Sequence, residues 1–335
     1  MGIFVNSDNS AFQVALNSEI YIDKTGLLTY TNKVMNTLQG YICNSRPRRF
    51  GKSITADMLT AYYSKGCDSG NMFSGLEISQ SPDFKEHLNR YDVIHWDIQW
   101  CIGAAGGADR VVSYITEKTI EELRKYYSEA IPSDTCSLPE ALSFICNATK
   151  NKFVVIIDEW DVLIRDMAAN SKIQDEYISF LRGLFKGTEP TKYIQLAYLT
   201  GILPIKKEKT QSALNNFDEF TMLSAGRLSP YIGFTEAEVK ELSERYQVEF
   251  DKVKAWYDGY ELVTMEGENR KTYSMYSPKS VVEAMLRHKF GTYWNQTETY
   301  EALKVYIQMN MDGLKDAVIE MLGGESVRVN TGTFM

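Results

Sequence analysis

The sequence predicts an α/β protein whose parallel sheet is covered by helices on both faces. Short apolar stretches alternate with amphipathic stretches through the first half of the chain. One apolar stretch, residues 152–157, contains no polar position from Phe153 to Ile157, as expected of a central strand that is buried on both faces. Hydrophobic residues make up 44% of the 335 residues and charged residues 24%, which is typical of a globular protein and not of a disordered chain.

Each expected element of the sheet follows from its pattern and its flanking residues. The expected strands cover residues 40–44, 91–98, 152–157 and 193–199. The expected helices between them cover residues 52–63, 109–130 and 173–185. Within residues 52–63, four apolar side chains recur at helical spacing and share one face. Because a helix lies between successive strands, the strands are expected to run parallel.

The pattern changes after Gly201, where helices with clear stop signals are expected to replace apolar strands. Ser277 and Pro278 are typical of a helix start, Gly291 of the end of that helix, and Gly323-Gly324 of the end of another. We therefore expect a core over residues 1–220 and a smaller, mainly helical domain over residues 221–335. Residues 326–330 alternate like a strand without a neighbour, so a further C-terminal domain is expected beyond this chain.

Charge and composition exclude several classes of protein. The chain carries 36 basic and 44 acidic residues, so its net charge of -8 does not indicate a polycationic nucleic-acid coat. Five scattered cysteines fit neither a disulfide framework nor a zinc site. No apolar run approaches the roughly 20 residues of a membrane helix, and the first ten residues do not resemble a secretory signal. A cytoplasmic protein without a membrane partner is expected.

The strongest functional signal is the segment Ser45–Ser53 (SRPRRFGKS), which lies between an expected strand and an expected helix. A phosphate-binding loop needs backbone N–H groups around an anion, a helix N-terminus, a lysine for the phosphates and a hydroxyl for Mg²⁺. Gly51, Lys52 and Ser53 supply the last three parts in order. The segment departs from the usual pattern because Arg46 stands where the first glycine is expected.

Three arginines in this loop have two open interpretations. Arg46, Arg48 and Arg49 could neutralise phosphate charge, or they could pair with some of the surplus carboxylates of the chain. Pro47 removes one backbone N–H donor, which a guanidinium would replace. The candidate nucleotide-binding residues are Arg46, Arg48, Arg49, Phe50, Gly51, Lys52, Ser53 and Ile54.

A second signal supports the first, because the apolar strand Phe153–Ile157 ends in Asp158 and Glu159. Ligands in open α/β folds bind at the carboxyl ends of the strands, where these two carboxylates are expected. Asp158 is a candidate magnesium ligand together with Ser53, and Glu159 a candidate general base for an attacking water. Thr200 ends the next apolar strand and either contacts a phosphate or the water, or caps the turn before Gly201.

Taken together, six segments of the chain resemble the AAA-ATPase-like family, a bacterial and archaeal group of P-loop NTPases. They are Tyr21–Thr25, Ser45–Ser53, Ile157–Glu159, Leu199–Gly201, Gly233–Thr235 and Trp256–Tyr260. The resemblance implies an AAA-like P-loop core followed by a helical lid, with ATP and Mg²⁺ as cofactors. It further implies Walker-A roles for Lys52 and Ser53, Walker-B roles for Asp158 and Glu159, and a sensor role for Thr200. It leaves the roles of Asp23 and Lys24 in the opening motif open.

The expected function is Mg²⁺-dependent ATP binding with hydrolysis, which drives or gates a partner domain. Members of this family often carry a nuclease-like domain after the lid, and that domain is expected to be absent from this chain. The partner would be such a domain, another protein or a second copy of the chain. Two alternatives stay open: a nucleotide-sensing interaction scaffold with little turnover, and a P-loop kinase.

Overall fold

The computed structural model describes residues 2–167, 170–205, 214–231, 233–266, 269–293 and 314–327. Its main sheet has five parallel strands in the order β2-β3-β4-β1-β5. These strands are β1 (Tyr41–Ser45), β2 (Asp92–Asp97), β3 (Phe153–Asp158), β4 (Ile194–Gly201) and β5 (Asp218–Phe220). The expected α/β class with a parallel sheet flanked by helices is therefore confirmed.

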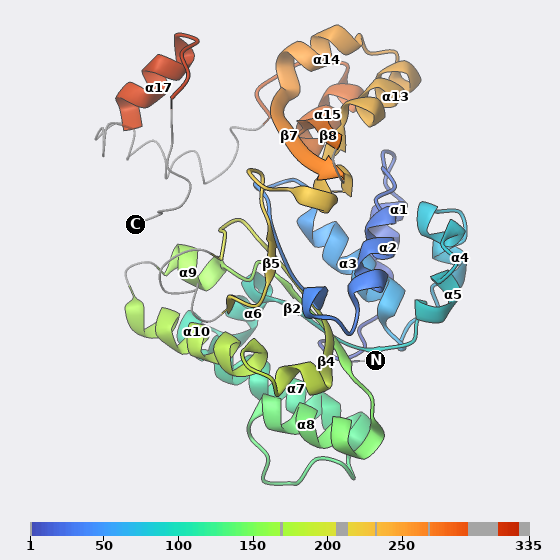
Figure 1. Ribbon diagram of the computed structural model, residues 1–335, viewed down its shortest axis with the longest axis vertical. Coiled ribbons are helices and arrows are strands. Elements are labelled where there is room, and N and C mark those ends of the chain that lie inside the picture. Colours follow the sequence, from blue (N-terminus) through green and yellow to red (C-terminus); the bar gives the residue numbers. More distant parts are fainter. Residues whose placement is uncertain are drawn as a thin grey trace.

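Helices cover both faces of the sheet, as Figure 1 shows. On one face lie α1 (Ser10–Leu16), α2 (Gly26–Val34), α3 (Lys52–Tyr63), α4 (Gly70–Phe73) and α5 (Phe84–His87). On the other lie α6 (Ile98–Ala105), α7 (Val111–Tyr127), α8 (Leu138–Thr149), α9 (Val162–Asp166), α10 (Ser171–Phe185) and α11 (Pro190–Tyr193). Short 3-10 turns are η1 (Leu38–Gly40), η2 (Glu77–Gln80), η3 (Ala108–Arg110) and η4 (Gly226–Tyr231).

This two-sided cover explains why the central strands are mainly apolar. Every residue of β1, β3 and β4 is buried. Along β3, Val154 and Ile156 pack beneath α3 and its neighbours, whereas Val155 and Ile157 pack against the helices of the opposite face. The strand ends at Asp158 and so delivers a carboxylate to the edge of the sheet.

A second group of elements follows the main sheet. It contains α13 (Glu236–Tyr246), α14 (Phe250–Tyr257) and α15 (Pro278–Arg287), which share an apolar cluster. It also contains an antiparallel sheet of β6 (Phe234–Thr235), β7 (Asp258–Glu266) and β8 (Asn269–Tyr276) in the order β6-β8-β7. We call residues 226–293 of the described chain the C-terminal part.

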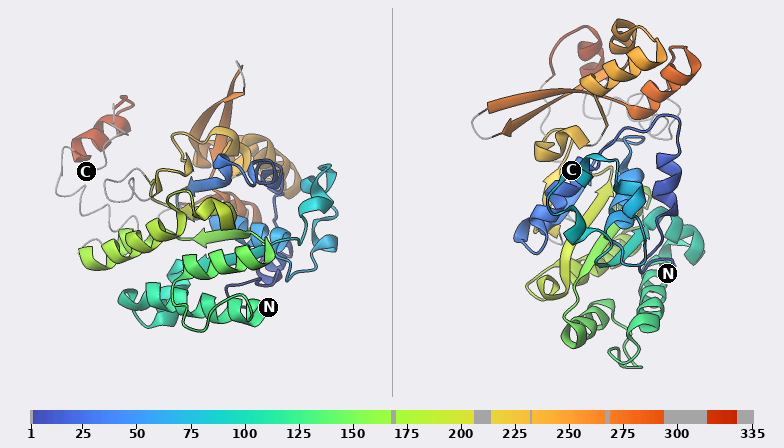
Figure 2. Two further views of the ribbon diagram at one scale, coloured as in Figure 1. Left: turned by 60° about the horizontal axis from the view of Figure 1, so that its bottom comes forward. Right: turned by 90° about the vertical axis from the view of Figure 1, so that its right-hand side faces the viewer.

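The hairpin of β7 and β8 differs from the mainly helical domain that was expected here. It extends away from the helices of the C-terminal part, as the right-hand view of Figure 2 shows. Its pattern has the period of a strand, because Leu262 and Thr264 are buried whereas Val263 and Met265 are exposed. A strand with alternating burial of this kind does not need a long apolar run. The expectation of helices depended on the absence of such runs after Gly201.

The helix ends agree with the sequence in part. Helix α15 begins at Pro278 after Ser277, as expected, but it ends at Arg287 and His288 adopts a left-handed conformation, so the expected end at Gly291 is too late. Helix α17 (Leu314–Leu322) is followed by Gly323 and Gly324, as expected. Of the expected last strand, Ser326 and Val327 are in no strand, and residues 328–330 lie outside the described residues. No helix in the described ranges is long and apolar enough to span a membrane.

Candidate nucleotide-binding site

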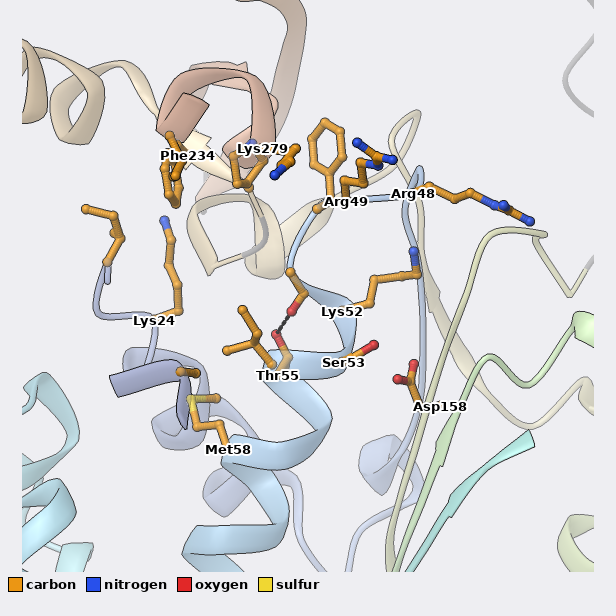
Figure 3. A pocket seen from close by; sticks show the side chains of 18 of the residues that line it. Lys24, Arg48, Arg49, Lys52, Ser53, Thr55, Met58, Asp158, Phe234 and Lys279 are labelled. Atoms are coloured by element: carbon orange, nitrogen blue, oxygen red, sulfur yellow. Dashed lines mark hydrogen bonds between the residues drawn. The ribbon is translucent and has the colours of Figure 1, made fainter. Parts of the chain in front are cut away.

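A cavity of about 910 Å³ lies where the main sheet meets the C-terminal part. Three groups of residues form its walls: the loop and first turn of α3, the acidic end of β3, and residues 20–24 together with the C-terminal part. Figure 3 shows the side chains of many of the residues that line it. The cavity therefore lies at the carboxyl ends of β1 and β3, which is the place where open α/β sheets bind their ligands.

The loop between β1 and α3 leaves the N-terminus of the helix open to the cavity. Gly51 is the N-cap of α3, with a left-handed φ of 76°, and it offers no side chain to cap the first turn. A Cβ at Gly51 would meet nothing within 4 Å, so the backbone conformation, and not crowding, calls for glycine. Because the first N–H groups of a helix have no partner within it, this end of α3 favours an anion.

Lys52 is the first residue of α3, and its side chain folds back onto this loop. It is buried, and its Nζ donates to the carbonyl oxygen of Pro47 at 3.1 Å. Burial lowers the pKa of Lys52, and the nearby charges of Glu159 and Asp158 oppose this shift. The structure thus holds an ammonium group against the loop that a phosphate would enter.

Asp158 occupies the end of β3 between two neighbouring strand ends. It stands opposite Asp97 of β2 and Thr200 of β4 in the register of the sheet. The pKa of Asp158 is raised to about 6, mainly by burial and also by the charges of Asp97 and Glu159, while a hydrogen bond from Ser53 opposes the shift. Ser53 and Asp158 face each other from α3 and β3 (Figure 3).

Ser53 and Asp158 are suited to supply the protein ligands of a magnesium ion whose other ligands come from phosphate and water. Within the described ranges, no group of three or more His, Cys, Asp and Glu side chains is placed to hold a metal by itself. Mg²⁺ in nucleotide enzymes is held by one or two protein oxygens, with phosphate oxygens and waters completing its shell. The hydroxyl of Ser53 and the carboxylate of Asp158 are oxygen ligands of the kind that such a shared site needs.

Glu159 follows Asp158 in a tight turn and carries an ion pair. Its φ of 50° is left-handed, which is uncommon for a residue with a side chain. Nη1 of Arg165 lies 3.3 Å from Oε2 of Glu159 and 3.3 Å from Oδ2 of Asp161. Asp161 also accepts the backbone N–H of Leu203 at 2.8 Å. This network fixes the turn after β3 against the turn after β4.

Arg165 and Asp161 are site residues that the sequence analysis missed. Arg165 lines the cavity, and Asp161 is fully buried beside it. The signal was present, because an aspartate and an arginine four residues apart at the start of a helix face each other. Gly201 belongs to the same network, since a Cβ there would lie 2.5 Å from Oδ1 of Asp161.

The structure does not place Arg46 or Thr200 among the residues that line this cavity. The Arg46 side chain is buried, and Nη1 donates to the carbonyl oxygens of Ser45 at 3.0 Å and of Phe220 at 3.1 Å. Arg46 therefore braces the end of β1 against β5. Burial lowers its pKa to about 10. Thr200 is also buried, and its Oγ1 has no hydrogen-bond partner among the described residues.

The other candidates of the loop do reach the cavity. Its lining includes Arg48, Arg49, Phe50, Gly51, Lys52, Ser53 and Ile54. Phe50 packs edge to face on Tyr260 with a centroid distance of 5.5 Å. A Cβ on Gly233 would lie 3.0 Å from the Phe50 ring, so glycine allows the chain to pass close to the loop. The segments Gly233–Thr235 and Trp256–Tyr260 thus meet around this phenylalanine.

The opposite end of the cavity, which we call the apolar end, has apolar side chains from two parts of the chain beside Lys24 and Lys279. Ile22 and Met58 contribute from the core, and Phe234 and Val282 from the C-terminal part. Lys24 lies between them, and its Nζ points toward Phe234 in Figure 3. Sequence reasoning did not assign a role to Lys24, because its partners lie more than 200 residues away in the chain.

Comparison with known proteins agrees with this geometry. The model of the AAA-ATPase-like family, described as a predicted AAA-ATPase, matches residues 10–210. An uncharacterized protein in the vnfD 5′ region of Azotobacter chroococcum mcd 1 is 28% identical over 290 residues, which cover 83% of this chain and 51% of that protein. The chain thus spans about half the length of this relative. The matched region contains the loop, the acidic strand end and Thr200, and the chain belongs to the AAA-ATPase-like family.

Proposed function

We propose that this chain binds Mg²⁺-ATP at the N-terminus of α3 and hydrolyses it. The observation that carries the proposal is the meeting of Lys52, Ser53 and Asp158 in one cavity. These residues come from two elements about a hundred positions apart, and each is of the type that a phosphate or its magnesium ion requires. Membership of an ATPase-like family supports nucleotide binding as the coarser conclusion.

Each residue has a proposed role in holding the triphosphate. The open N–H groups of α3 and the Lys52 ammonium bind phosphate oxygens. Ser53 and Asp158 hold Mg²⁺, which when bound supplies positive charge to the phosphate oxygens. Arg48 and Arg49 line the same cavity and add guanidinium donors that suit phosphate. Arg46 is left out of this set because its side chain braces β5.

The proposed hydrolytic step uses Glu159 as the general base. Its carboxylate would accept a proton from a water molecule that attacks the terminal phosphorus, while the bond from this phosphorus to the bridging oxygen breaks and ADP leaves. Arg165 holds that carboxylate in place in the structure. Thr200 stands beside Asp158 in the sheet, and its buried Oγ1, which has no hydrogen-bond partner in the described part of the chain, supports a sensor role at the edge of the site.

The apolar end of the cavity suits the base of the nucleotide. Ile22, Met58, Phe234 and Val282 offer an apolar slot in which a purine ring can lie. We propose adenine as the base. Nucleotide contacts with both the core and the C-terminal part would couple the site to a partner domain or protein, or to a second copy of the chain.

A second candidate function is nucleotide sensing with little turnover. The observation that favours it is the ion pair of Glu159 with Arg165, since this contact engages a carboxylate oxygen that a general base would need for the attacking water. The two functions share the binding site and differ only in the fate of the nucleotide.

Nucleotide-dependent melting and ATP turnover, measured side by side, test the proposal. Stabilisation by Mg²⁺-ATP together with phosphate release in the absence of an acceptor supports the ATPase. Stabilisation without turnover supports the sensor, and turnover only with an added acceptor would identify a kinase. A melting temperature that Mg²⁺-ATP does not change would contradict nucleotide binding in any form.

A further inference from the structure

The opening motif Tyr21–Thr25 connects the core to the C-terminal part through a partly buried ion pair. Nζ of Lys24 donates to both carboxylate oxygens of Glu238, at 2.6 and 2.7 Å, and to the carbonyl oxygen of Pro230 at 2.7 Å. The Lys24 side chain is 14% exposed and that of Glu238 is 24% exposed. Burial lowers the pKa of Lys24, and the charge of Glu238 opposes that shift.

The residue before Lys24 fixes the stem of this contact. One oxygen of Asp23 accepts the backbone N–H and the hydroxyl of Thr25, at 2.8 and 2.7 Å. The other accepts the backbone N–H of Glu77 at 2.6 Å. Asp23 therefore anchors the motif to the core, and Lys24 extends from that anchor to the C-terminal part.

Glu238 occupies a defined position at the start of α13. Its carboxylate accepts the backbone N–H of Thr235 at 2.7 Å, and the Thr235 hydroxyl accepts the N–H of Glu238, which completes a capping box. Phe234 precedes Thr235 and lines the apolar end of the cavity. The carboxylate that Lys24 binds is therefore joined to the residue after Phe234 by one hydrogen bond, and Phe234 belongs to the wall against which the base would pack.

Lys24 itself is poorly placed to bind the nucleotide directly. An ammonium group has three donors, and the three contacts of Lys24 account for all of them. A ligand that used the ammonium would have to break a bond to Glu238 or to Pro230. A structural task at the cavity wall fits these contacts better than contact with the ligand.

We infer that Lys24 is a positioning residue whose ion pair with Glu238 holds Phe234 and the start of α13 at the base end of the nucleotide pocket. This inference rests on the proposed function of the site. The phosphate end is built from α3 and β3, which the pair does not touch. Loss of the pair therefore weakens recognition of the base and leaves the phosphate contacts in place.

Two variants and two ligands test this assignment. Lys24→Met keeps the aliphatic stem, and Glu238→Gln keeps an oxygen that can accept the Thr235 N–H. Calorimetric titrations compare Mg²⁺-ATP with Mg²⁺-tripolyphosphate, which lacks base and sugar. The control is Lys240→Met, which removes an exposed ion pair with Glu236 from the same helix α13.

We expect each variant to weaken ATP binding about tenfold, with the double variant no worse than either alone, because the two residues act as one unit. Binding of tripolyphosphate should stay within about twofold of wild type, and KM for ATP should rise while kcat changes little. Lys240→Met should leave all these values unchanged. If Lys24→Met does not fold, Glu238→Gln provides the same comparison.

Two results would overturn the assignment. In the first, both variants bind ATP as tightly as wild type. In the second, tripolyphosphate binding falls as much as ATP binding, which would indicate general damage and not a role at the base end. A wild-type chain that binds neither ligand would instead refute the proposed function, and this inference with it.

Discussion

Nη1 of Arg165 lies 3.3 Å from Oε2 of Glu159 and 3.3 Å from Oδ2 of Asp161, so one guanidinium group joins both acids of the turn after β3. The contact with Asp161 is structural, because this buried carboxylate also accepts two backbone N–H groups from the turn after β4. The contact with Glu159 concerns the proposed base. The same arginine therefore connects the fixed frame of the site with the group that would activate water.

Glu159→Gln should separate binding from hydrolysis. Glutamine keeps the size and hydrogen bonding of the side chain but cannot take a proton, so turnover should fall by roughly 10² or more while Mg²⁺-ATP still binds. Phosphate release and calorimetry on the same sample measure the two effects. Asp166→Asn is a matched control, because Asp166 also bonds to Arg165, at 2.8 Å, but has no proposed part in proton transfer. Hydrolysis at the wild-type rate would place the base elsewhere.

The three loop arginines should respond differently to replacement by lysine. Arg48→Lys or Arg49→Lys should weaken ATP binding by about 1.5–3 kcal/mol, the range for hydrogen bonds to charged groups, because lysine cannot reproduce a bidentate contact. Arg46→Lys should instead lower the free energy of unfolding by a similar amount, about 1–3 kcal/mol, since it disturbs the bonds to Ser45 and Phe220. Urea unfolding and calorimetry distinguish the two classes. If all three variants bind ATP as tightly as wild type does, the arginines do not contact the nucleotide.

Asp57 gives the protein a testable dependence on pH. It lies on α3, and burial, helped by the charges of Asp158 and Asp97, raises its pKa from 3.8 to about 7. Between these two pH values, the Asp57 carboxyl is ionised in the unfolded state but keeps its proton in the folded state. Asp57 therefore makes the free energy of unfolding fall as pH rises. Well below pH 3.8 Asp57 is protonated in both states, and its contribution to stability is fully present.

Asp57→Asn removes this titration. The variant should match wild type near pH 4 and be more stable than wild type near pH 8, by an amount on the order of a few kcal/mol at most. Urea unfolding at the two pH values measures the difference. Asp68→Asn, at an exposed position, is the control and should change stability little at either pH. A difference between wild type and Asp57→Asn that is equal at both pH values would contradict the raised pKa.

The parts of the fold that depend on local pattern were predictable from the sequence. The helix over Lys52–Tyr63 begins and ends where its apolar spacing and the preceding glycine indicate. The apolar strand before Asp158 was recognisable because a strand covered on both faces contains almost no polar residue. The two together placed Lys52, Ser53 and Asp158 at one edge of the sheet, which is the basis of the candidate site.

The parts that depend on distant contacts were not predictable in the same way. Arg46 is at the position of a phosphate-binding glycine, yet its side chain bonds to Phe220, a residue whose strand β5 has only three positions and little apolar signal. Lys24 and Glu238 are separated by 214 residues, and nothing in either local segment indicates the other. The β7–β8 hairpin alternates exposed and buried residues without an apolar run, so the pattern was overlooked.

The central claim is that the Lys52 loop binds Mg²⁺-ATP, and the melting temperature of wild type and Lys52→Ala with and without Mg²⁺-ATP tests it most directly. A ligand that binds only the folded state stabilises it by about 2.7 kcal/mol at a hundredfold excess over its dissociation constant. We expect millimolar Mg²⁺-ATP to raise the melting temperature of wild type and of Lys118→Ala, an exposed control, and to leave that of Lys52→Ala nearly unchanged. A wild-type melting temperature that Mg²⁺-ATP does not change, or an equal rise in Lys52→Ala, would contradict the account.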